Sequence, residues 1–229
     1  MDYEDLNYFF ISLFSLPLAL NAQSVDEMLQ KVSAAIEAGQ NGQAVSYFRQ
    51  TISLNIDRTE MYYWTNVDKN SEVSVKLANE LVVAYKKNRN YDKAYLFYKE
   101  LLQKAPNNVD YLESCAEMQV YRGQEKDALH MYEKILQLDA DNLAANIFLG
   151  NYYYLMAERE KKQLEADYKK ISSPTKMQYA RYRDGLSKVF STGYERARSS
   201  LQKVVLRFPS TEAQKTLDKI LRIEKEVKR

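Results

Sequence analysis

Apolar side chains recur at the spacing of amphipathic helices along most of this chain. Residues at positions i, i+3, i+4 and i+7 lie on one side of a helix, so apolar residues there mark a buried face. Residues 75–108 carry two such stripes, separated by a polar turn at 88–90 and closed by Pro106, which cannot continue a helix. This segment is therefore predicted to fold as a pair of helices. The first stripe consists of Ala78, Leu81, Val82 and Tyr85, and the second of Ala94, Phe97, Tyr98, Leu101 and Leu102.

The same helix pair returns 34 residues further along the chain. An internal period of this length in a helical sequence is the signature of a stacked array of helix pairs. With only six glycines and four prolines in 229 residues, the composition also favours long helices over a sheet of many strands. The positions that repeat are Ala94 and Ala128, Tyr98 and Tyr132, Leu101 and Ile135, Leu102 and Leu136, and Asn108 and Asn142.

These repeated positions resemble the tetratricopeptide repeat (TPR) family. The likeness rests on a small residue in the first helix (Ala116, Gly150), an alanine that opens each second helix, an aromatic residue one turn later, and the closing Pro106. The chain departs from the family in having no tryptophan in the first helices and Ala140 in place of a second closing proline. The resemblance implies an all-α fold, a right-handed superhelical array of antiparallel helix pairs (a TPR-like α-solenoid) with a C-terminal capping helix.

Outside the two best units the register slips, which indicates insertions. Ala44 and Ala94 are 50 residues apart, 16 more than one period, and Ala128 and Ala197 are 69 apart, 35 more than one period. We predict one repeat domain over 23–229. Its insertion near 157–190 is either an extended first helix followed by a returning helix or a degenerate extra unit. The predicted units lie near 25–58, 75–108, 109–142 and 143–211, and the amphipathic segment 212–229 is predicted to cap the array.

The apolar run at 8–20 predicts a secretory signal peptide. As a helix its 13 residues would reach roughly 20 Å, short of a bilayer core of about 30 Å, so a spanning helix is not expected. The small residue Ala22 fits a cleavage site, which predicts a signal peptide over 1–22 and a mature chain in a bacterial periplasm or cell envelope. The first ten residues contain three acids and no Lys or Arg, unlike a usual signal. The alternative is an uncleaved N-terminal element on a cytoplasmic protein.

Few residues in this chain suit catalysis or metal binding. Cys115 replaces Leu81 in the repeat alignment, which makes it a core position, and the single histidine, His130, has no fixed relation to it. The acidic turn at 139–142 lacks the glycine and the glutamate of a calcium loop, and the sequence has no glycine-rich phosphate loop. We predict that the protein is not an enzyme and binds no cofactor or metal.

Charge and aromatic residues narrow the class of partner. The formal net charge is only +2, and the nine basic residues of the insertion alternate with five acids, as on a solvated helix face. Nucleic acid is therefore not an expected partner. Adjacent tyrosines at 152–154 point about 100° apart on a helix, so some must be exposed, and exposed tyrosines favour contact surfaces.

In the TPR family, the first helices line a concave groove that holds a peptide or helix of a partner. The resemblance therefore implies a non-catalytic protein-interaction scaffold, with a cytosolic regulatory or assembly module as the alternative. Glu113 and Glu117 would repel the C-terminal carboxylate that the best-known TPR subgroup binds, so a mixed-charge or amphipathic protein segment is the expected partner. The residues implied to line the groove are Lys76, Asn79, Val83, Lys86, Asp110, Glu113, Glu117, Ile147 and Asn151.

Intact-mass measurement and N-terminal sequencing of the protein purified from its native host test the predicted export. We expect the mature chain to begin at Gln23, because cleavage follows the small residue at the end of the apolar run. A purified chain that retains residue 1 would contradict the signal-peptide prediction and favour the cytoplasmic alternative.

Overall fold

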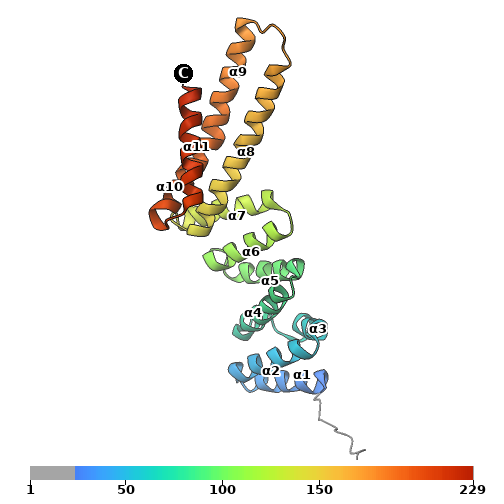
Figure 1. Ribbon diagram of the computed structural model, residues 1–229. Coiled ribbons are helices and arrows are strands. Elements are labelled where there is room, and N and C mark those ends of the chain that lie inside the picture. Colours follow the sequence, from blue (N-terminus) through green and yellow to red (C-terminus); the bar gives the residue numbers. More distant parts are fainter. Residues whose placement is uncertain (1–23, 229) are drawn as a thin grey trace, which may run out of the picture. The chain divides into compact units, whose positions relative to one another are not determined.

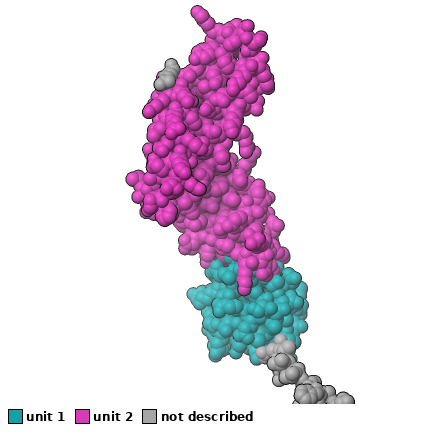
Figure 2. Space-filling view, viewed as in Figure 1, with its two compact units in different colours: residues 1–84 teal, residues 85–229 magenta. Residues whose placement is uncertain are grey.

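The computed structural model describes residues 24–228, and every regular element within that range is helical (Figure 1). The predicted signal peptide at 1–22 lies outside the described residues. The chain divides into two compact units, residues 1–84 and 85–229, coloured teal and magenta in Figure 2. The division falls within helix α4 (Glu72–Lys87), which contributes residues to both units.

Unit 1 is built on the helix pair α1 (Val25–Glu37) and α2 (Asn41–Leu54), which pack along each other. Helix α3 (Ile56–Asn66) follows at once, because Asn55 both ends α2 and caps α3, with its side chain accepting a hydrogen bond from the backbone N–H of Arg58 at 2.9 Å. Helix α3 lies between Ala44 and Ala94, whose spacing is 16 residues longer than one repeat period. The Tyr62 and Ser33 hydroxyls lie 2.7 Å apart and connect α3 to α1.

Asparagine caps fix where three helices of the repeat begin. The side chains of Asn90, Asn108 and Asn142 accept hydrogen bonds from the backbone N–H groups three residues further on, at 3.2, 3.0 and 2.9 Å. An N-cap of this kind stabilises a helix by about 1 kcal/mol because it satisfies a backbone donor that the helix leaves free. The repeated pair Asn108 and Asn142 therefore sets the start of α6 (Val109–Tyr121) and of α8 (Leu143–Lys169).

Three helix pairs turn through a residue in the left-handed backbone region. Gly39, Arg89 and Gly123 have φ angles of 69°, 56° and 72°, and each stands just before the residue at the N-cap position of the next helix. Glycine adopts this conformation without strain, whereas a side chain costs about 1–2 kcal/mol. The turn geometry is thus common to the pairs even though the residue differs.

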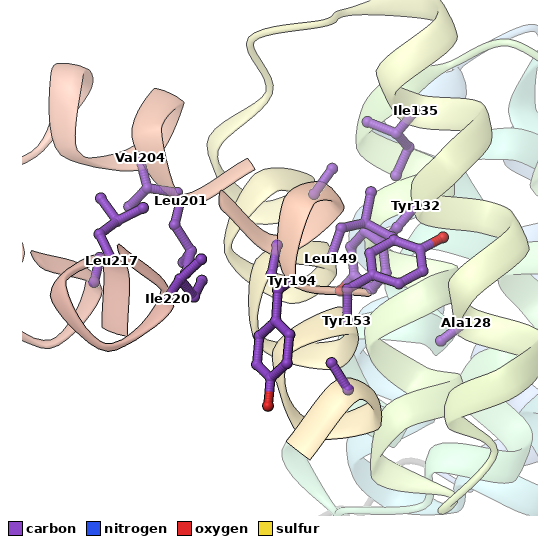
Figure 3. Close-up of a cluster of buried hydrophobic side chains, with 14 of the residues drawn as sticks. Ala128, Tyr132, Ile135, Leu149, Tyr153, Tyr194, Leu201, Val204, Leu217 and Ile220 are labelled. Atoms are coloured by element: carbon purple, nitrogen blue, oxygen red, sulfur yellow. The ribbon is translucent and has the colours of Figure 1, made fainter. Parts of the chain in front are cut away.

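Unit 2 continues with α5 (Tyr91–Lys104), α6, α7 (Glu125–Leu138) and α8, and each of these helices packs against the next. Helix α8 also packs against α10 (Glu195–Arg207). The core between them contains Leu112, Ala128, Tyr132, Ile135 and Leu149. Figure 3 shows Tyr132 and Tyr153 lying beside Leu149 within this core.

Helix α8 runs for 27 residues, and α9 (Lys176–Val189) returns along its second half (Figure 1). The Tyr168 and Tyr182 rings stack with centroids 4.4 Å apart, and Gly185 lets Leu164 approach the α9 backbone. Arg183 donates hydrogen bonds to the main-chain oxygens of Glu226 and Val227, at 3.1 and 2.6 Å, and so joins α9 to the end of α11 (Thr211–Val227). Residues 157–190 thus contain the second half of α8 and the whole of α9, which returns along it.

A π-helical turn, η1 (Phe190–Tyr194), leads from α9 into α10. A Cβ placed on Gly150 of α8 would lie 2.7 Å from Leu201 of α10, and one on Gly193 would lie 2.6 Å from Ala157. These glycines allow α8, η1 and α10 to pack at short range. Helix α11 then covers the outer side of α10, where Leu217 and Ile220 meet Leu201 and Val204 (Figure 3).

The turn at Gly123 provides a test of the shared backbone geometry. Gly123→Ala should lower the free energy of unfolding by about 1 kcal/mol, because a Cβ there meets no atom within 4 Å and the whole cost is backbone strain. Gly42→Ala is the matched control: it also adds a methyl group in open space, but on helix α2 at an ordinary φ. That control should be neutral or stabilise by about 0.5 kcal/mol. Urea denaturation measures both, and equal effects would contradict the explanation.

Candidate functional site

The residues predicted to line the groove fall in both units. Lys76, Asn79 and Val83 belong to the part of α4 that lies in unit 1. Lys76 and Val83 are exposed, whereas the Asn79 side chain donates a hydrogen bond to the backbone oxygen of Val75 at 2.9 Å. The remaining six residues belong to unit 2, and they are Lys86, Asp110, Glu113, Glu117, Ile147 and Asn151.

Two of the predicted groove residues in unit 2 form an ion pair with each other. Lys86 Nζ donates a hydrogen bond to Glu117 Oε2 at 2.9 Å, and the Tyr121 hydroxyl donates to Glu117 Oε1 at 3.2 Å. Partial burial alone would lower the pKa of Lys86, but the hydrogen bond and charge of Glu117 raise it overall. The Glu117 charge likewise raises the pKa of Tyr121. Lys86 and Glu117 therefore neutralise each other. Sequence reasoning had treated them as separate basic and acidic parts of the groove.

Among the residues that the structure describes, the other two predicted groove residues of α6, Glu113 and Asp110, form no ion pair with Lys86. Asn142 Nδ2 donates to Glu113 Oε2 at 3.3 Å, while the oxygen of the same amide caps α8. Glu113 therefore supports the spacing between α6 and α8. Asp110 lies exposed in the first turn of α6, where a negative charge is favoured by the helix dipole.

An apolar cleft of about 490 Å³ opens between α6, α7 and α8, and we call it the aromatic cleft. Three predicted groove residues line it, namely Glu117, Ile147 and Asn151. Tyr121, Ile147 and Leu155 are exposed, so their apolar surface faces solvent. Its apolar wall consists of Val120, Tyr121, Ile147, Phe148, Tyr152 and Leu155.

A row of stacked rings forms the floor of the aromatic cleft. The Phe148 ring lies 4.3 Å from the Tyr132 ring and 5.8 Å from the Tyr152 ring, both in stacked geometry. Burial, followed by the nearby charges of Glu113 and Glu117, raises the pKa of Tyr132 to about 12. Tyr132 therefore stays protonated, and its ring forms the floor of the cleft together with the rings of Phe148 and Tyr152.

Sequence reasoning missed most of this wall. Phe148, Leu155 and Tyr121 were not among the implied groove residues, although Ile147, Asn151 and Leu155 recur every four residues along one side of α8. That spacing, together with the run of tyrosines at 152–154, was the available signal. The side on which Tyr152 lies depends on how α7 packs, which a helical stripe does not specify.

A second cleft, of about 570 Å³, lies along the other side of α8, and we call it the lysine cleft. Ile147 and Asn151 line it as well, so the first half of α8 is a wall shared by the two clefts. Leu201, Val204 and Phe208 supply its apolar surface from α10 and its end. Lys215, Lys219 and Glu212 supply its charges from α11.

The residues considered for catalysis do not come together as a reactive pair. Cys115 is buried, and burial raises the pKa of its thiol to about 11, so it stays protonated near neutral pH. His130 is exposed on α7, with its Nδ1 3.7 Å from Glu133 Oε2. Within residues 24–228, no three His, Cys, Asp or Glu side chains are grouped as metal ligands would be. In the same range, no helix is both long and apolar enough to cross a membrane.

Residues 24–228 therefore define an all-α helical-repeat protein of the TPR-like α-solenoid class. The chain is similar to the crystal structure of a protein from Bacteroides ovatus ATCC 8483 that is provisionally described as protein-binding. The two are 89% identical, with a TM-score of 0.80, over 90% of this chain and 100% of that one. At this identity over the whole length of that relative, the chain belongs to the same protein family as the B. ovatus protein.

More distant solved structures include two proteins with low superposition scores. YrrB, described as a TPR protein with an unusual peptide-binding site, is 14% identical with a TM-score of 0.36, over 88% of this chain and 92% of its own. MamA is 17% identical with a TM-score of 0.35, over 67% of this chain and 89% of its own. Scores this low add nothing to the assignment. The chain matches no protein-family model and no curated protein.

The inertness of the single thiol can be measured. Cys115 should react with a disulfide reagent at pH 8 at least about a hundredfold more slowly in the native protein than in guanidinium, because a thiol of pKa about 11 is roughly one part in a thousand thiolate there. The unfolded chain is the internal control, since it exposes the same thiol at its ordinary pKa. Equal rates would contradict the buried placement and reopen the catalytic hypothesis.

Proposed function

We propose that this protein is a non-catalytic interaction scaffold that holds a segment of a partner protein in the aromatic cleft of unit 2. The observation that carries the proposal is an apolar cleft walled by exposed Tyr121, Ile147 and Leu155 over stacked rings. Rigid aromatic and aliphatic groups that face solvent are typical of the energetic centre of a protein interface. The description of the B. ovatus relative as protein-binding supports the same class of function.

A protein segment fits this cleft better than a small polar substrate does. The polar groups at its edge are few, and the Glu117 carboxylate is already occupied by Lys86 and Tyr121. A substrate site would place several unsatisfied polar groups around one point to fix the orientation of the ligand. An apolar surface with a polar edge instead suits the side chains of a partner, with water excluded around them.

The proposed groove extends beyond the aromatic cleft. In unit 2 it includes Asp110 of α6, a position implied by the family resemblance. The proposed repeat domain over 23–229 closes with a capping segment at 212–229, most of which is helix α11. Export to a bacterial periplasm or cell envelope, supported by the apolar run at 8–20, belongs to the same proposal. The alternative remains a cytoplasmic regulatory or assembly module that uses the same cleft.

The scaffold function predicts a residue-specific loss of binding. Leu155→Asp should weaken capture of the partner from extracts of the native host by at least about tenfold, because a buried charge replaces an apolar contact. Leu96→Asp is the matched control: Leu96 is 51% exposed on α5, outside the cleft, and Leu155 is 62% exposed. Both exposed sites should tolerate the change within about 0.5 kcal/mol of stability, which urea denaturation checks.

The readout is quantitative mass spectrometry of proteins that co-purify with the tagged chain. A partner retained by wild type and by Leu96→Asp but lost by Leu155→Asp supports the cleft as the binding site. If Leu155→Asp captures the same proteins in the same amounts as wild type, the aromatic cleft is not the site.

A further inference from the structure

The two clefts of unit 2 meet at one side of α8. Ile147 and Asn151 line both of them, so a chain that crosses α8 at these residues contacts the aromatic cleft on one side and the lysine cleft on the other. A helix with its side chains is about 10 Å across, so a path from α6 across α8 to α11 that crosses about two helix widths covers roughly 20 Å. An extended chain covers that distance in about six residues.

The edge of the aromatic cleft is acidic. Glu117 and Glu125 line it, and Glu113 lies close enough to raise the pKa of Tyr132 on its floor. Lys86 neutralises Glu117, but the exposed Glu125 carboxylate forms no hydrogen bond or ion pair within residues 24–228. Glu125 is therefore the negative charge at this edge that is available to a partner.

The lysine cleft has the opposite balance of charge. Lys215 and Lys219 are four residues apart on α11, which places both on one side of the helix. Both are exposed, and neither forms an ion pair in the described part of the chain. Glu212 contributes one negative charge at the start of the helix, where the helix dipole favours it. Two positive charges against one negative leave this cleft attractive to an anionic group.

We infer that the segment bound by this protein is dipolar: it carries Lys or Arg at one end, an aromatic or aliphatic side chain in the middle, and Asp or Glu about six residues further on. The inference rests on the proposed function and specifies its partner. The cationic end meets Glu125, the apolar group enters the aromatic cleft beside Ile147, and the anionic end meets Lys215 and Lys219. Complementary charge of this kind fixes the register and direction of a bound segment more than it adds affinity.

The chain's own N-terminal residues do not have this chemistry. The first 23 residues contain three acids and no Lys or Arg, so they offer no cationic side chain to the acidic edge. A segment of a different protein matches the two clefts better.

Synthetic peptides of about ten residues test the order of charges. The dipolar probe has two lysines, a Leu-Trp centre and two glutamates, with serine spacers, and it is made in both chain directions. The control probe has the same composition with Lys and Glu alternating at each end. Fluorescence anisotropy at about 0.1 M salt measures binding, since the Debye length of about 10 Å then limits the effect to nearby charges.

Single charge reversals in the full chain locate the contacts. Glu125→Lys and Lys219→Glu should each weaken binding of the dipolar probe by roughly fivefold, the range of partly exposed charge pairs. Asp127→Lys is the matched control for the first variant, because Asp127 also lies in the first turn of α7 but outside both clefts. Arg222→Glu is the control for the second, because Arg222 is exposed on α11 but outside both clefts. Both controls should change binding by less than about twofold.

The outcomes separate this inference from the proposed function. Stronger binding of the dipolar probe than of the mixed probe, with losses in the two cleft variants alone, supports the inference. If both probes bind equally and Leu155→Asp abolishes both, the partner is not dipolar while the cleft function stands. Failure of both probes to bind at millimolar concentration overturns the inference, and the capture experiment still decides the function. A wild-type dimer in sedimentation that Leu155→Asp dissociates also overturns it, since the occupant is then a second copy.

Discussion

The close contact between α8 and α10 is the constraint on which the functional part of the molecule depends. Gly150 has no side chain where Leu201 crosses it, and Gly193 has none where Ala157 crosses it. These two approaches allow a 27-residue helix to pack simultaneously on α7, α9 and α10. Leu201, which crosses α8 at Gly150, also lines the lysine cleft, so this contact positions Ile147 and Asn151, which form the wall shared by the two clefts. A larger side chain at either glycine would move the wall and change both clefts together.

Polar contacts hold the same helix in register. Glu133 of α7 accepts hydrogen bonds from the Tyr153 hydroxyl at 2.5 Å and from Arg196 at 3.0 Å, so one carboxylate joins α7, α8 and α10. The Arg196 guanidinium also lies 3.9 Å from the centre of the Tyr153 ring. Burial and then the bond to Glu133 raise the pKa of Tyr153, which therefore stays a neutral donor. Since the apolar contacts set the distance between the helices, these directional bonds set their rotation, and rotation decides which residues face the clefts.

The sequence allowed the all-α repeat class to be predicted, and the structure confirms it, because a 34-residue period reports local helix pairing directly. The caps at Asn108 and Asn142 follow from the same period. The site was less accessible to prediction. The likeness to the TPR family implied Glu117 and Lys86 as groove residues but gave no sign that they bind each other, since that contact depends on tertiary packing within unit 2. Phe148 was missed because a residue between two helices can face either the core or a cleft, and only tertiary packing decides which.

The ion pair between Lys86 and Glu117 leaves few unpaired charges beside the two clefts, and these can make the proposed binding selective. A scaffold whose charged residues were all unpaired would attract many partners of the opposite sign, with little selectivity. Here Lys86 is paired with Glu117, which lines the aromatic cleft, and outside both clefts Arg198 is paired with Glu224. The exposed Glu125 lines the aromatic cleft and the exposed Lys219 lines the lysine cleft, so the two charges lie on either side of the shared wall. In the function proposed above, the apolar cleft supplies affinity through burial. Glu125 and Lys219 then set which segment is bound and in which direction, because each opposes a wrong charge as well as favouring a right one.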